Sequence, residues 1–271
     1  MRKPGETLKG FRRKVWNYYR KEGRSLPWRR TRDPYRILVS EVMLQQTQAE
    51  RVIPKYNEFL RRFPDFLSLA EASVAEILSV WQGLGYNRRV LNLKRLSGIV
   101  VENYSGRLPH DIDLLQRLPG IGKATAGAVA AFAFGIPVPF IETNIRRAFI
   151  NSFFRHREKI NDEEILKVVC ETMDTKNPRE WFHALMDYGA MLGRSQVNHN
   201  LKSTPYRRQT PFRGSNRELR GKVLRLLLKG PLTKKAIVHG VSGENDHVEK
   251  ILILLEGEGF VRKEGRRFRL S

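Results

Sequence analysis

Cysteine is almost absent from this chain of 271 residues, since Cys170 is the only one. A single thiol excludes a disulfide framework and any cluster that needs several thiolate ligands. No apolar run reaches the length of a membrane span, and the first ten residues lack the apolar core of a signal peptide. The histidines show no metal-ligand spacing. We therefore expect an intracellular protein, in a cytoplasm (nucleoid-associated) or a nucleus, with no membrane, metal or cofactor.

Acidic residues are also scarce relative to basic ones. The chain has 50 Lys and Arg against 28 Asp and Glu, which gives a formal net charge of +22 and a pI of about 10.5. Such an excess is typical of proteins that bind polyanions such as nucleic acid. With 41% hydrophobic residues the chain can still bury a core, and its length accommodates two domains.

Strand-like alternation is missing before residue 255, and helical periodicity dominates. The pattern predicts an all-α fold class. Helices are expected near residues 11–19, 37–48, 50–62, 73–82, 87–103, 111–117, 123–134, 143–155, 161–174 and 178–192. Gly, Pro or Asn separate most of them.

The composition changes after the last of these helices. Residues 194–215 are polar, basic and without periodicity, so we interpret them as a linker between a domain at 1–193 and a domain at 216–271. In the second domain we expect helices at 219–228, 231–238 and 246–256, followed by a hairpin of strands 260–263 and 267–270. Three helices and a two-stranded ribbon are typical of a winged helix, which binds DNA or docks onto protein; the sequence leaves both open.

A glycine hairpin between two expected helices is the most informative local feature. Residues 118–129 read LPGIGKATAGAV, in which Gly120 and Gly122 allow a tight turn. The unpaired N–H groups and positive dipole end of the following helix, with Lys123 and Thr125 beside them, suit a DNA phosphate. An ordinary helix–helix turn is the alternative, which the charge of the chain disfavours.

Two carboxylates are candidates for chemistry. Glu41 interrupts an apolar helix, where burial would raise its pKa and make it a general acid; a solvent-facing glutamate is the alternative. Gln45 and Gln46 follow at the end of that helix, and their amides can hydrogen-bond base edges. Glu142 precedes Asn144 at an expected helix start, where it is either a cap or a catalytic anion.

An aromatic residue on a glycine turn is a further DNA-binding candidate. Tyr86 ends the run GLGY at 83–86 and could either intercalate in DNA or pack in the core. Arg88 and Arg89 follow, as expected beside phosphates.

Together these segments resemble the helix-hairpin-helix DNA glycosylases, and especially their adenine-excising MutY branch. The resemblance spans residues 8–193 and rests on LPWR at 26–29, DPYRILVSEVMLQQTQ at 33–48, GLGY at 83–86, LPGIGKATAGAV at 118–129 and MDYGAM at 186–191. It implies a two-lobed helical fold that binds double-stranded DNA containing a damaged or mispaired base, as a monomer, and flips that base into a cleft.

The resemblance also assigns roles by position. Glu41 matches the acid that protonates the leaving purine, and Asn144 matches an asparagine next to the catalytic aspartate. Gln45 and Gln46 match the glutamines that probe the disrupted base pair, and Tyr86 the wedge beside it. The LPWR segment contributes Leu26, Trp28 and Arg29 to the expected base pocket.

The chain departs from the family pattern at four points. Glu142 replaces the aspartate that stabilises the oxocarbenium-like sugar, and Ala124 replaces the lysine of strand-cutting relatives. The cysteines of the family's iron–sulfur loop are missing, and a winged helix is expected where the branch carries a domain that reads 8-oxoguanine. We therefore expect a monofunctional glycosylase for adenine opposite 8-oxoguanine or guanine. The alternatives are a glycosylase for another lesion and a catalytically weak DNA-damage-binding protein.

Overall fold

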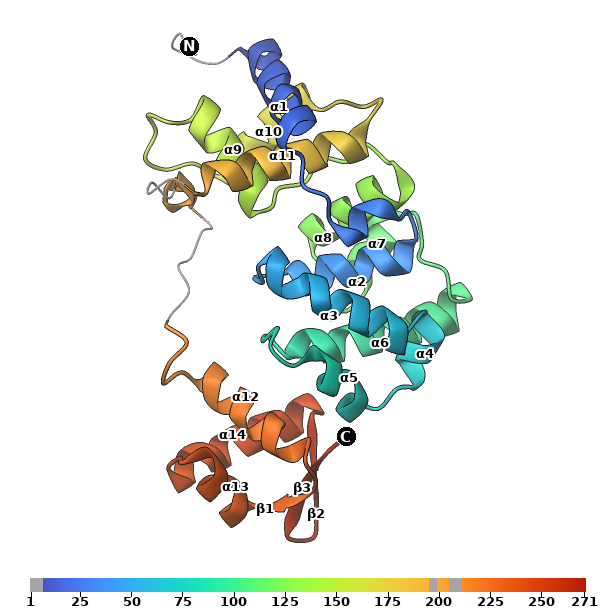
Figure 1. Cartoon of the computed structure of the whole chain (residues 1–271), viewed down its shortest axis with the longest axis vertical. Coiled ribbons are helices and arrows are strands. Elements are labelled where there is room, and N and C mark those ends of the chain that lie inside the picture. Colours follow the sequence, from blue (N-terminus) through green and yellow to red (C-terminus); the bar gives the residue numbers. More distant parts are fainter. Residues whose placement is uncertain (1–6, 195–198, 205–210) are drawn as a thin grey trace. The chain divides into compact units, whose positions relative to one another are not determined.

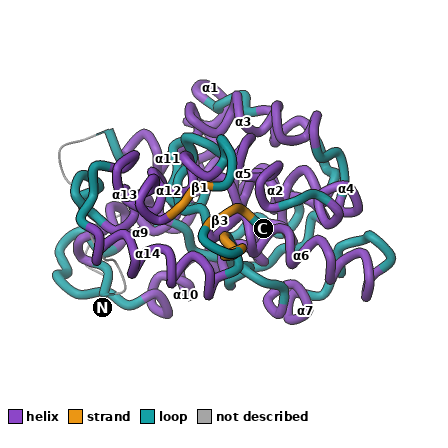
Figure 2. Tube along the Cα trace, turned by 90° about the horizontal axis from the view of Figure 1, so that it is seen from below, coloured by secondary structure: helices purple, strands orange, loops and turns teal. Residues whose placement is uncertain are grey.

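The computed structural model describes residues 7–194, 199–204 and 211–271, and most of these residues are helical (Figure 1). The predicted all-α class is confirmed. Three short strands near the C-terminus form one antiparallel sheet in the order β1-β3-β2. Figure 2 shows strand residues in orange among the helices, with β1 and β3 labelled. No helix among the described residues is both long and apolar enough to cross a bilayer. Much of the expected linker at 194–215 lies outside the described residues.

The chain forms two compact units, and neither is a single continuous segment. One comprises Met1–Leu38, His110–Arg117 and Ile121–Arg208, and the other Val39–Pro109, Leu118–Gly120 and Gln209–Ser271. Helix α2 (Pro34–Leu44) begins in the first unit and ends in the second. The predicted boundaries at 193 and 216 stay a prediction.

The first unit is built from helices. It holds α1 (Leu8–Glu22), η1 (Pro27–Arg30), α7 (Ile112–Arg117), α8 (Lys123–Val129), η2 (Ala130–Phe134), α9 (Thr143–Phe153), α10 (Asp162–Thr172), α11 (Pro178–Leu192) and η3 (His199–Lys202). Phe11 of α1 is fully buried, and its ring lies 5.0 Å from that of Phe149 on α9 and 6.4 Å from that of Trp181 on α11. These aromatic contacts hold α1, α9 and α11 around one core.

The second unit contains the remaining helices and all the strands. They are α3 (Ala49–Arg62), α4 (Phe66–Glu71), α5 (Val74–Trp81), α6 (Arg88–Tyr104), α12 (Asn216–Leu227), β1 (Leu232–Thr233), α13 (Lys234–Val241), α14 (Asn245–Glu258), β2 (Val261–Glu264) and β3 (Arg267–Leu270). The short helices α4 and α5 begin at capping boxes formed by Asp65 and Ser73. Lys94 of α6 donates to the carbonyls of Ala70 and Ala72, which fixes the turn between them.

The C-terminal residues have the arrangement of a winged helix. Helices α12, α13 and α14 enclose Val223, Ile237 and Ile251, all essentially unexposed, and β2 and β3 form the wing. The helix predicted at 231–238 is α13, which begins later, at Lys234, and strand β1 before it, in which Leu232 pairs with Phe268, was not predicted. A strand of two residues is too short to show an alternating pattern in the sequence. Strand β1 is stabilised by its pairing with β3, which lies far along the chain.

Other elements also differ from the sequence prediction, among them η1 and η3, which were not predicted. Helix α4 was not predicted, since six residues are too few to show a period. Helix α2 ends at Leu44, so Gln45 and Gln46 lie in the turn after it, where Gln46 has a φ of +55°. The helix expected at 123–134 changes to π geometry at Ala130 and ends at Gly135, whose φ is +68°.

Candidate functional site

The GLGY turn before α6 has a conformation that its glycines make possible. Gly83 and Gly85 have φ values of +89° and +71°, and Tyr86 itself has a φ of +48°. The indole N–H of Trp81 donates to the carbonyl of Gly85 at 3.2 Å. The turn therefore holds Tyr86 in a backbone conformation that a non-glycine residue seldom adopts.

Arg89 fixes this turn against the end of α2. Its guanidinium donates to the carbonyls of Val42, Met43 and Gln45, each at 2.8 Å, and to that of Gly85 at 2.9 Å. The residue is only 6% exposed, and burial lowers its pKa to about 10. These bonds join the Gln45 and Tyr86 turns, and the contact of Arg89 with DNA stays a prediction.

The first half of the glycine hairpin lies next to Gln45. The Gln45 amide donates to the carbonyl of Gly120 at 3.4 Å. Gly120 has a φ of +80°, and a Cβ atom there would lie 2.9 Å from the side chain of Asn92. Both the conformation and the close approach require glycine at this position.

The Gln45 and Tyr86 turns line a hollow of about 370 Å³, together with residues of α6, α12 and α14, and we call it the Tyr86 pocket. Five of the predicted DNA-binding residues line it: Gln45, Gln46, Tyr86, Arg88 and Arg89. The side chain of Arg88 is 73% exposed, in contrast to its neighbour Arg89. The second unit therefore brings together amides, an aromatic ring and an accessible cation, which are the groups that nucleotides bind.

The second half of the hairpin belongs to the first unit. Gly122 is the N-cap of α8 in extended conformation and makes no side-chain cap hydrogen bond. Lys123 is exposed and Thr125 half-buried in the first turn of the helix. A phosphate contact by these three residues stays a prediction.

Glu41 lies on α2 among buried apolar neighbours. Leu38, Val42 and Met43 are between 0% and 4% exposed, whereas Glu41 is half-buried. Its side chain is thus neither on a fully solvated face nor sealed in the core. This placement is compatible with a proton donor, and its role as general acid stays a prediction.

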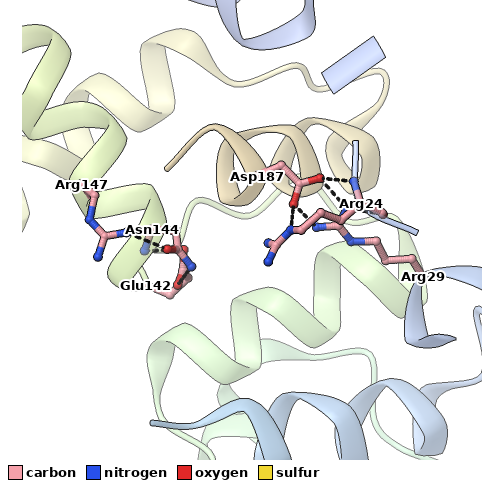
Figure 3. Close-up of polar contacts among 6 residues, drawn as sticks. All are labelled: Arg24, Arg29, Glu142, Asn144, Arg147 and Asp187. Carbon is pink, nitrogen blue, oxygen red and sulfur yellow. Dashed lines mark hydrogen bonds and ion pairs between the residues drawn. The ribbon is translucent and has the colours of Figure 1, made fainter. Parts of the chain in front are cut away.

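Glu142 is the N-cap of α9 (Figure 3). Its Oε1 accepts hydrogen bonds from the backbone N–H groups of Asn144 at 2.8 Å and Ile145 at 2.7 Å. Oε2 accepts from the Asn144 amide at 3.2 Å, and the Asn144 oxygen in turn accepts from Arg147 at 2.9 Å. Desolvation raises the pKa of Glu142, opposed by the two N–H bonds and by the charges of Arg146 and Arg147. The cap interpretation is therefore correct in geometry, and it does not exclude a catalytic anion.

A buried ion-pair cluster ties the LPWR segment to α11 (Figure 3). Asp187 accepts two hydrogen bonds from Arg29, each at 2.7 Å, and two from Arg24, at 2.6 and 2.9 Å. Burial alone would raise the pKa of Asp187, but the bonds and charges of Arg29 and Arg24 outweigh it and hold that pKa below its usual range. No local sequence pattern predicts this cluster, because its partners lie some 160 residues apart.

This cluster changes the interpretation of the expected base pocket. Leu26 and Trp28 are 8% and 5% exposed and belong to the core of the first unit. The guanidinium of Arg29 is bound to Asp187. A direct contact of these three side chains with a base stays a prediction, while their structural role is clear.

The helix–glycine hairpin–helix, the basic character and the two helix-held glutamates define the class of helix-hairpin-helix DNA-binding proteins. Comparison with protein families gives the same answer. Residues 39–172 match the profile of the HhH-GPD superfamily base excision DNA repair proteins. The chain belongs to this family.

Several relatives support the assignment. Adenine DNA glycosylase of Mycolicibacterium smegmatis is 34% identical over 229 residues, which are 78% of each chain. The adenine DNA glycosylase of Buchnera aphidicola subsp. Baizongia pistaciae is 35% identical, and the match covers 67% of this chain and 52% of that protein. The human adenine DNA glycosylase is 34% identical, and the match covers 66% of this chain and 35% of that protein. The chain thus spans about half the length of the Buchnera relative and about a third of the human one.

Solved structures agree on the fold. A thermostable thymine-DNA glycosylase superimposes with a TM-score of 0.63 and 27% identity, covering 71% of this chain and 90% of the other. An endonuclease III–DNA complex gives a TM-score of 0.61 at 20% identity, over 70% of this chain and 89% of its own.

The family pattern includes an iron–sulfur cluster, and the donor set does not fit one. Four thiolates are needed, whereas this chain has one cysteine, Cys170, which is exposed on α10. We assign no part of the chemistry to such a group.

Proposed function

We propose that this protein is a monofunctional DNA glycosylase that removes adenine opposite 8-oxoguanine or guanine. The observation that carries the proposal is the 34% identity to a mycobacterial adenine DNA glycosylase over 78% of both chains. The retained Glu41, Gln45, Gln46 and Tyr86 support it further.

The proposed reaction needs one acid and one anion. Glu41 donates its proton to a ring nitrogen of the flipped adenine, and the C1′–N9 bond breaks as the base leaves neutral. The carboxylate of Glu142 stabilises the positive charge that develops on the sugar, and Asn144 and Arg147 hold it in position. Water then adds to C1′, and its proton passes to a carboxylate, which regenerates the acid.

The monofunctional character follows from Ala124. An alanine has no amine, so no Schiff base forms at this position and no strand is cut by elimination. Lys123 is adjacent in sequence, but successive residues of a helix point in different directions.

Thymine opposite guanine is a second candidate substrate. It is favoured by the likeness to the thermostable thymine-DNA glycosylase, at 27% identity. A pyrimidine base leaves with less help from ring protonation, so this activity would depend less on Glu41.

The test is base release from a panel of duplexes, with and without alkali after the reaction. The panel contains adenine opposite 8-oxoguanine, adenine opposite guanine, thymine opposite guanine, and matched pairs. We expect breaks at adenine after alkali only, and Glu41→Gln should lose about 10²–10⁴-fold in rate while still binding DNA.

Each other outcome identifies a competing function. Release of thymine alone would replace adenine by the second candidate. Covalent trapping by borohydride would contradict the monofunctional character and implicate Lys123. Binding without release from any duplex would favour a DNA-damage-binding protein.

A further inference from the structure

The C-terminal winged helix carries its positive charge on the wing and not on its third helix. The wing, which comprises residues 261–270, contains five basic residues and one acidic residue. The third helix, α14, contains four acidic residues and one lysine. In three-helix DNA-binding modules the third helix enters the major groove, where the flanking phosphates would repel this charge. The wing is therefore the part of this module that suits a polyanion.

The pairing of β2 with β3 divides the side chains of the wing between two faces (Figure 1). Successive residues of a strand point to opposite faces of the sheet. One face packs on the core through the buried side chains of Val261, Phe268 and Leu270. The opposite face is polar and, with the exposed arginine of the turn, forms what we call the arginine face: Arg262, Glu264, Arg266, Arg267 and Arg269.

Two arginines of this face lie directly opposite each other. Arg262 and Arg269 are partners in the register of the two strands, and their side chains are 52% and 41% exposed. Like charges in directly opposite positions weaken the pairing of two strands. Glu264 reduces this repulsion, since its carboxylate lies 3.1 Å from Arg262 and 3.3 Å from Arg269. Each of its oxygens is thereby taken by one guanidinium, so the face keeps a positive charge at its strand partner, Arg267.

The charges of Arg266 and Arg267 are not neutralised within the part of the chain that the structure describes. Both residues are exposed, and neither side chain forms an ion pair or a hydrogen bond with a described residue. The neighbouring carboxylate of α14, that of Glu256, accepts from the backbone N–H of Lys263 at 3.1 Å. Because β2 is an edge strand and backbone N–H groups lie in the plane of the sheet, this carboxylate is at the edge and not on the arginine face.

The chemistry of this face fits the phosphates of a nucleic-acid backbone. Guanidinium groups are planar, permanently charged donors that match two phosphate oxygens at once. Residues 261–270, all of which the structure describes, place no amide, aromatic ring or apolar side chain on this face. Amides read bases, and apolar or aromatic anchors are typical of protein interfaces. A duplex bound independently of its sequence is therefore the partner that fits, in keeping with the DNA repair family of the chain.

We propose that the arginine face is a second DNA-binding surface of this protein, which contacts the phosphates of a duplex and reads neither base nor lesion. The winged helix binds DNA through its wing and not through α14. These contacts add affinity for any duplex, whether or not it contains a damaged base. The inference goes beyond the proposed base excision, because it requires binding alone.

The test measures binding of the full chain to two fluorescently labelled duplexes by anisotropy at several salt concentrations. One duplex is intact, and the other contains a tetrahydrofuran abasic analogue opposite guanine. We expect the double variant Arg266→Ala/Arg267→Ala to bind both duplexes about 10-fold more weakly at low salt, with the slope of log K against log[salt] reduced by about 2. The matched control, Lys235→Ala/Lys250→Ala, removes the same charge from α13 and α14 and should change the affinity by less than about 2-fold.

Glu264→Gln should change binding and stability in opposite directions. Removal of the one acidic side chain of the arginine face should strengthen binding to both duplexes by about 2- to 3-fold. The same change leaves Arg262 opposite Arg269 without the carboxylate between them, so the melting temperature should fall. A residue that only supports the fold would lower both quantities.

Several results would overturn the proposal. They are wild-type affinity of the double arginine variant, an equal loss in the lysine control, a loss confined to the abasic duplex, and weaker DNA binding by Glu264→Gln. Arg266→Lys/Arg267→Lys keeps both charges and should retain the wild-type salt slope even if the alanine variant melts early; loss of that slope would also contradict the proposal.

The outcome of this test is separate from that of the proposed function. Since nothing is excised, absence of base release by the wild-type protein would contradict the proposed function and leave the binding test intact. Release of adenine together with unchanged binding by the double arginine variant would overturn this inference alone.

Discussion

A Cβ atom added to Gly189 of α11 would lie 2.0 Å from the carbonyl oxygen of Asn144 at the start of α9. Real Cβ atoms do not approach a backbone oxygen so closely, so the two helices meet only because residue 189 is glycine. Arg147 of α9 also donates to the carbonyl of Gly189 at 2.9 Å. The family motif MDYGAM therefore positions Glu142 through the neighbouring helix.

Gly189→Ala should consequently damage both stability and activity. The start of α9 must move away, at a typical overpacking cost of about 1–3 kcal/mol, and the carboxylate of Glu142 moves with it. Urea unfolding and single-turnover base release measure the two effects. The control is Gly98→Ala in α6, where no atom lies within 4 Å of the added Cβ and stability should rise by about 0.5–1 kcal/mol. Equal behaviour of the two variants would contradict the packing argument.

Substitutions of Glu142 distinguish its role as the N-cap of α9 from the role of its negative charge in catalysis. Glu142→Gln keeps an oxygen that can accept from Asn144 and Ile145, so unfolding should change by less than about 1 kcal/mol, while base release falls by about 100-fold or more. Glu142→Asp keeps charge and cap but moves the carboxylate, and we expect it to be slower than wild type. Base release at the wild-type rate by the Gln variant would leave Glu142 with the cap alone.

The pH dependence of the rate should reflect the raised pKa of Glu142. Only the carboxylate form stabilises a positive sugar, so activity must fall as pH decreases through this pKa. Because desolvation raises the pKa, the acid limb of the single-turnover rate should lie above pH 4.5, the ordinary value for glutamate. A limb at or below that value in the wild-type enzyme would contradict the desolvated carboxylate.

Asp187→Asn should be strongly destabilising. Arg29, with 8% of its side chain exposed, would keep a buried charge without its anion, a change that typically costs about 3–5 kcal/mol. The lowered pKa of Asp187 means that its contribution is full above its unfolded-state pKa and is lost as pH falls through the folded-state value. Urea unfolding between pH 2 and 6 should therefore show a weaker pH dependence in the variant.

The control for this experiment is a pair on the surface. Glu249→Gln removes the partner of Lys234, 2.7 Å away and half exposed, and should cost at most about 1 kcal/mol. A loss at Asp187 no larger than at Glu249 would show that the buried cluster contributes little.

Local patterns predicted the long helices well, because each buries one face along its whole length. The helix expected at 178–192 is α11 to the residue, and that at 143–155 differs from α9 by two residues at its end. Long-range relationships could not be predicted in this way. Arg88 and Arg89 are equivalent in sequence, yet only the structure shows that one is exposed and the other is enclosed by carbonyls from a distant turn.

The candidate site likewise contains some features that local patterns predict and others that they do not. The cap at Glu142 is a local motif, and the sequence contained it as one of two alternatives. The contact of Arg217 with Tyr86 joins residues 131 positions apart, and no period or motif encodes it. The winged helix was predicted from its order of elements, but the contact of its first helix, α12, with the Tyr86 turn was not.

The interleaved composition of the two units has a consequence for synthesis on the ribosome. The unit that contains residues 39–109 also contains 209–271, so its compact form cannot be completed until the last part of the chain has emerged. For most of translation the Tyr86 turn must therefore remain without Arg217 and Arg220 of α12, which line the Tyr86 pocket in the complete unit. A premature stop near residue 208 would accordingly release an incomplete unit rather than a smaller working protein, and such fragments should be recognised by chaperones and proteases.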